Sequence, residues 1–185
     1  MKLGADAYRL RDISFELMLL TRGFVHFDFS DLDIDHPIYQ YTVTGFLSTI
    51  KVKLVELAIH QRNLDDEFKN LVSDTSHAFH NDRSIMDTAF VKQEYAFDRI
   101  STCVLTSLRE VSNKIIHVDK FVLAGAFEDA ITQAELTKIG EPDLARVVML
   151  HGKKGKSDWC VLFDLLVYCE QCYLFGEILA EQYGI

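Results

Sequence analysis

The second half of the chain contains three residues whose side chains could act together in acid–base chemistry. Arg109, Asn113 and His117 are spaced four residues apart, so on a helix they form one row along its length. A histidine titrates near neutral pH and transfers protons, while an arginine binds phosphate and stabilises developing negative charge. An amide between them can orient the imidazole. Together these groups suit cleavage of an RNA phosphodiester without a metal, with the 2′-hydroxyl as the nucleophile.

The same segment carries the apolar pattern of a helix that packs on a core. Apolar residues recur there at intervals of three and four: Val104, Leu105, Leu108, Val111, Ile115 and Ile116. A purely structural interpretation is therefore also open. In it, Arg109 pairs with an acid on a neighbouring element, His117 caps the C-terminus of the helix and Asn113 bonds the adjacent loop.

The segment LREVSNKIIH, residues 108–117, resembles the motif region of HEPN-type helical domains. Many prokaryotic members of that family are toxin or defence ribonucleases, and others are noncatalytic. The resemblance implies a bundle of four or five helices that often pairs two copies, so that their motifs face each other. It matches His117 to the motif histidine, with the acid–base role, and Asn113 to the polar residue of the motif. Arg109 precedes His117 by more residues than the family motif usually has, and would reach the same site from one helical turn earlier. Ser112 stands where the family most often has an arginine.

Two functional hypotheses from different classes follow. The first is a HEPN-like endoribonuclease of the toxin–antitoxin or defence type. It would act on RNA as a homodimer, without a cofactor or metal, and would have an antitoxin-like protein as a candidate partner. The second is a noncatalytic helical module for interaction or dimerisation, which the acidic charge and Ser112 favour. A third possibility is a metal or small-ligand bundle that uses His60, His77 or His80, although a zinc site requires three or four convergent ligands.

The expected fold is a single, mainly α domain over residues 1–185: a four- to five-helix bundle with a small β-hairpin before the C-terminal helix. The expected helices are Ala5–Arg22, ended by Gly23; Pro37 to about Asn63; Asp65–Phe79; Ser84 to about His117; a weak one at Ala126–Leu136; and Asp164–Tyr183. Within an insert at about 119–163, the expected extended segments are Lys120–Leu123, Ala145–His151 and Asp158–Phe163.

Composition narrows the partners and the compartment. The chain has 185 residues and a net charge of -9, which argues against a nonspecific nucleic-acid surface. Its start lacks the features of a signal peptide, and no apolar run approaches the ~20 residues of a membrane span, so we expect a cytoplasmic protein without membrane contact. We expect Cys169 and Cys172 to be reduced and to pack in the core. We interpret Gly155, Lys156 and Ser157 as a hairpin turn rather than a phosphate-binding loop.

Overall fold

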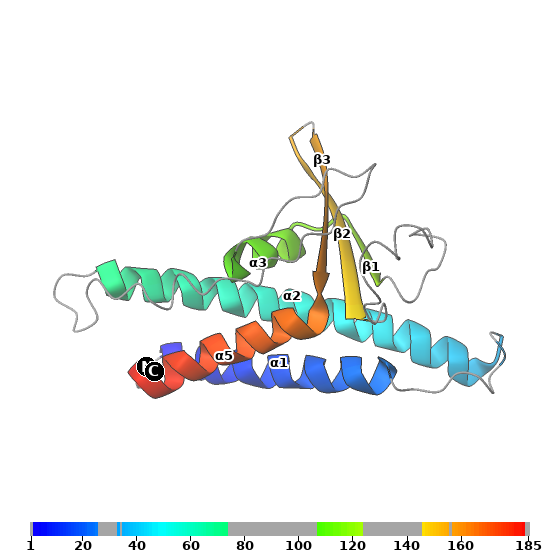
Figure 1. Ribbon diagram of the computed structural model, residues 1–185, viewed down its shortest axis with the longest axis horizontal. Coiled ribbons are helices and arrows are strands. Elements are labelled where there is room, and N and C mark those ends of the chain that lie inside the picture. Colours follow the sequence, from blue (N-terminus) through cyan, green and yellow to red (C-terminus); the bar gives the residue numbers. More distant parts are fainter. Residues whose placement is uncertain are drawn as a thin grey trace.

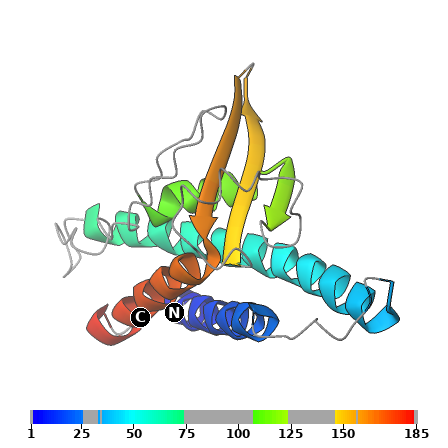
Figure 2. The ribbon, with the colours of Figure 1, turned by 45° about the vertical axis from the view of Figure 1, so that its right-hand side comes forward.

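The computed structural model describes residues 2–25, 33, 35–73, 107–123, 146–155 and 157–183. The protein is mainly α, as predicted, with a small antiparallel sheet before its C-terminal helix. Helices α1 (Lys2–Val25), α2 (Pro37–Ser73) and α5 (Leu165–Tyr183) form a base. The short helix α3 (Leu108–Ile116) and the sheet rise from one side of this base (Figures 1 and 2).

The first two helices are longer than their patterns predicted. Gly23 does not end α1, which continues to Val25. The predicted break after Asn63 is also wrong, because α2 runs unbroken from Pro37 to Ser73. No proline or glycine occurs between Phe46 and Ser73, and a single buried stripe continues through the expected boundary, formed by Leu57, Gln61, Leu64 and Phe68. The start at Pro37 is confirmed.

Helix α3 begins later than predicted. Ser107 has extended backbone angles (φ -144°, ψ 157°), and its hydroxyl accepts a hydrogen bond from the Glu110 amide, which makes it the N-cap. The prediction of one continuous helix from Val104 to His117 is therefore wrong, because the backbone at Ser107 is extended. The rest of the predicted Ser84–His117 helix lies outside the described residues, as do His77, His80 and the predicted Ala126–Leu136 helix.

The predicted hairpin and extended segment are both present and form one sheet. Strands β1 (Lys120–Leu123), β2 (Val147–Lys154) and β3 (Ser157–Asp164) pair antiparallel in the order β1-β2-β3. The hairpin turn contains Gly155 at a φ of 64°, a conformation that suits glycine. Trp159 lies so close over Gly152 that a Cβ there would be 2.1 Å from the indole ring. The Lys114 ammonium lies 4.1 Å from the same ring, which connects α3 to the hairpin.

The core lies where α1, α2 and α5 meet beneath the sheet. Helix α1 packs against both α2 and α5, and the largest fully buried side chains include Phe68, Phe163, Tyr168 and Phe175. Cys169 and Cys172 are buried in this core, as expected. Burial raises the pKa of both thiols above the ordinary value, so they remain protonated and pack as small apolar groups.

A buried polar cluster joins three helices inside this core. Ser112 of α3 donates to Gln61 Oε1 of α2 at 2.7 Å, and its hydroxyl lies 2.8 Å from the Tyr168 hydroxyl of α5. Because Ser112 has one proton, which Gln61 receives, Tyr168 must donate to Ser112. Burial raises the pKa of Tyr168 well above its usual value, so the phenol remains a donor. The cluster thereby fixes the position of α3 against α2 and α5.

We predict that Ser112→Ala lowers the free energy of unfolding by about 1–3 kcal/mol, because it leaves two buried polar groups without their shared partner. Urea denaturation measures this. Ser48→Ala is the control, since Ser48 is exposed and donates to the Gly45 carbonyl within its own helix turn. The cost of Ser112→Ala combined with Tyr168→Phe should be less than the sum of the two single costs. A strictly additive pair would contradict the cluster.

Candidate functional site

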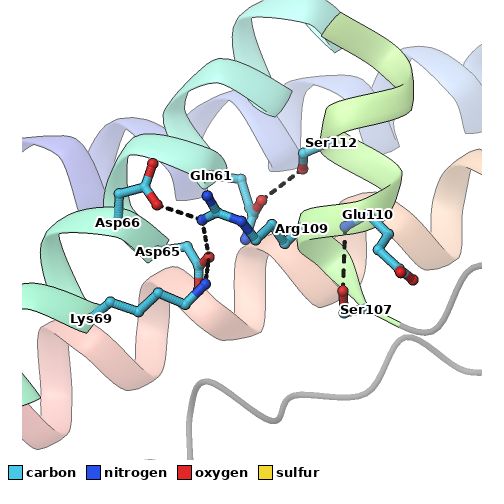
Figure 3. A network of polar contacts seen from close by, with 8 residues as sticks. All are labelled: Gln61, Asp65, Asp66, Lys69, Ser107, Arg109, Glu110 and Ser112. Atoms are coloured by element: carbon cyan, nitrogen blue, oxygen red, sulfur yellow. Dashed lines mark hydrogen bonds and ion pairs between the residues drawn. The ribbon is translucent and has the colours of Figure 1, made fainter. Parts of the chain in front are cut away.

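Arg109 extends from α3 toward α2, where two carboxylates hold its guanidinium (Figure 3). Its Nη1 lies 2.5 Å from Asp65 Oδ2 and 2.6 Å from Asp66 Oδ1. Lys69, one turn further along α2, places its Nζ 2.7 Å from Asp65 Oδ2. The Asp65 side chain is only 6% exposed. The first residue of the predicted catalytic row is thus part of an ion-pair network between two helices.

The charges within this network balance. Two cations face two carboxylates, and hydrogen bonds to Asp66 and Asp65 raise the pKa of Arg109 above its ordinary value. A buried carboxylate requires such partners, because an unpaired charge removed from water is costly. A phosphate that approached Arg109 would meet two like-charged carboxylates at the same nitrogen. The geometry therefore explains Arg109 as a structural cation, as the alternative interpretation of the sequence anticipated.

The other two residues of the row have different surroundings. The Asn113 side-chain oxygen is buried, and among the described residues it has no hydrogen-bond partner. His117 is exposed in the turn that ends α3, and its backbone amide donates to the Asn113 carbonyl at 3.2 Å. Of the three residues, His117 is therefore the most exposed, whereas Arg109 and Asn113 are partly buried. The catalytic assignment of Arg109, Asn113 and His117 stays a prediction.

The surroundings of Ser112 show whether the arginine usual in the HEPN-type motif could fit in this chain. This position, where the resemblance would place an arginine, is fully buried between α2 and α5. An arginine here would replace the small hydroxyl that Gln61 and Tyr168 share, and its charge would have no acid beside it in the described cluster. The serine is therefore required by the packing of α3 in this chain, and a motif arginine could not simply be substituted for it.

The candidate metal ligands are engaged elsewhere or lie outside the described ranges. His60 Nδ1 is 3.8 Å from Asp6 Oδ1. Glu56, one turn before His60 on α2, forms an ion pair with Arg9 at 2.6 Å. Within the described parts of the chain, no three His, Cys, Asp or Glu side chains gather in a way that could bind a metal. None of the helices described combines the length and apolar character that a membrane span requires.

A second surface, which the sequence reasoning missed, lies where the end of α1 meets the start of α2. A hollow of about 530 Å³ opens between the two helices. We call this surface the α1–α2 end patch. Leu19, Leu20, Gly23, Tyr41 and Gly45 line the hollow, and the patch also includes the exposed Ile38, one helical turn before Tyr41. Phe24 and Phe46 stack at 3.9 Å beside the hollow and hold the two helices together. Tyr41 is 82% exposed, Leu19 56% and Ile38 55%, so the patch is apolar and open to solvent.

Two signals in the sequence mark this patch in hindsight. Residues 37–50 contain no charged side chain, although a quarter of the chain is charged. Helices α1 and α2 also each carry one glycine near this end, Gly23 and Gly45, where glycine is unfavourable. Neither signal could locate the hollow, because that depends on how the two helices pair.

The chain gives no significant match to a protein-family model, a curated protein or a solved structure.

We predict that Arg109→Met destabilises the protein by about 1–3 kcal/mol, because it removes a cation from a buried carboxylate that retains Lys69. Chemical denaturation provides the measurement. The matched control is Arg9→Met, which breaks the exposed pair with Glu56 and should cost about 0–1 kcal/mol. Equal costs for the two substitutions would show that the Arg109 network contributes no more than a surface ion pair.

Proposed function

We propose that this protein is a noncatalytic helical interaction module, which binds a protein partner through the α1–α2 end patch. One observation carries the proposal: the Arg109 guanidinium, the phosphate contact that cleavage would need, is neutralised by Asp65 and Asp66. With the Ser112 cluster, this makes α3 a structural helix. Of the row that suggested chemistry, Arg109 is then explained by the attachment of α3 to the base.

The charge of the protein supports the same proposal. A net charge of -9 repels RNA, and tight backbone binding requires a basic face. Lys69, the second cation beside Asp65, is likewise paired with a carboxylate, so it adds no unpaired positive charge near Arg109. The HEPN-type family that LREVSNKIIH resembles includes noncatalytic members, so the resemblance and the proposal are compatible.

The α1–α2 end patch supplies the binding surface that the proposal needs. Single exposed apolar side chains are ordinary on protein surfaces, whereas a group of them beside a hollow is typical of an interaction site. Tyr41 is well suited to such a role, because tyrosine is enriched at protein interfaces and combines a large apolar ring with a hydroxyl.

Metal-independent RNA cleavage remains the second candidate, and the exposure of His117 favours it. Both ion pairs of Arg109 pass through Nη1, and a guanidinium carries five N–H donors. In this candidate His117 acts as the acid–base group, Arg109 contacts the phosphate and Asn113 orients the imidazole, with two copies forming the site.

We predict that the purified protein leaves single-stranded RNA and transfer RNA intact, at the same background rate as His117→Ala. Gel electrophoresis of end-labelled RNA, in the presence of a chelator, measures this. Cleavage by the wild-type protein that His117→Ala abolishes would overturn the proposal and establish the second candidate. Cleavage that persists in both proteins would indicate a contaminating nuclease. Purifying both proteins again under denaturing conditions and then refolding them would remove it.

A further inference from the structure

We draw no further inference here: the strongest candidate, the exposed apolar surface around the hollow between the end of α1 and the start of α2, belongs to the surface already proposed for binding, and nothing in the structure shows what covers it.

Discussion

Asp65 is a carboxylate buried in the flank of α2, and leaving a buried charge without a cation beside it is strongly destabilising. Lys69 supplies one from its own helix, and Arg109 supplies the other from a helix 44 residues away in sequence. One turn before Asp65, Gln61 accepts the hydroxyl of Ser112. Two positions one turn apart on α2 thus hold two positions one turn apart on α3, and Tyr168 extends the connection to α5.

This constraint decides how the chemistry-bearing residues are used. Arg109 and Ser112 are committed to holding α3 in place, and the sheet depends on the same helix through Lys114 and Trp159. The other end of α2 differs, because there exposed apolar side chains of α1 and α2 surround a hollow. The polar side chains of the α2–α3 junction therefore bond to one another, whereas the apolar side chains of the α1–α2 end patch are exposed to solvent. The patch is the surface that we propose for binding.

The parts of the fold that local patterns determine were predictable. Pro37 starts a helix because its ring suits the first turn, and the alternating strands about Gly155 form a hairpin. Other features depend on distant residues. The continuity of α2 past Asn63 follows from packing that keeps Leu64 buried, and the start of α3 follows from the Ser107 cap. The sequence showed that Arg109 could pair with an acid, but not that the acid would be Asp65. Predicting the hollow between Gly23 and Gly45 would require knowing how α1 and α2 pack against each other.

Hydrogen exchange followed by mass spectrometry tests the central claim, that the buried Asp65 holds α3 on the base, most directly. In Asp65→Asn, which keeps the size of the side chain and removes its charge, we expect amides of Leu108–Ile116 to exchange faster while those of α1 and α5 retain their protection. Unchanged protection of Leu108–Ile116 in that variant would contradict the claim and return Arg109 to the candidates for chemistry.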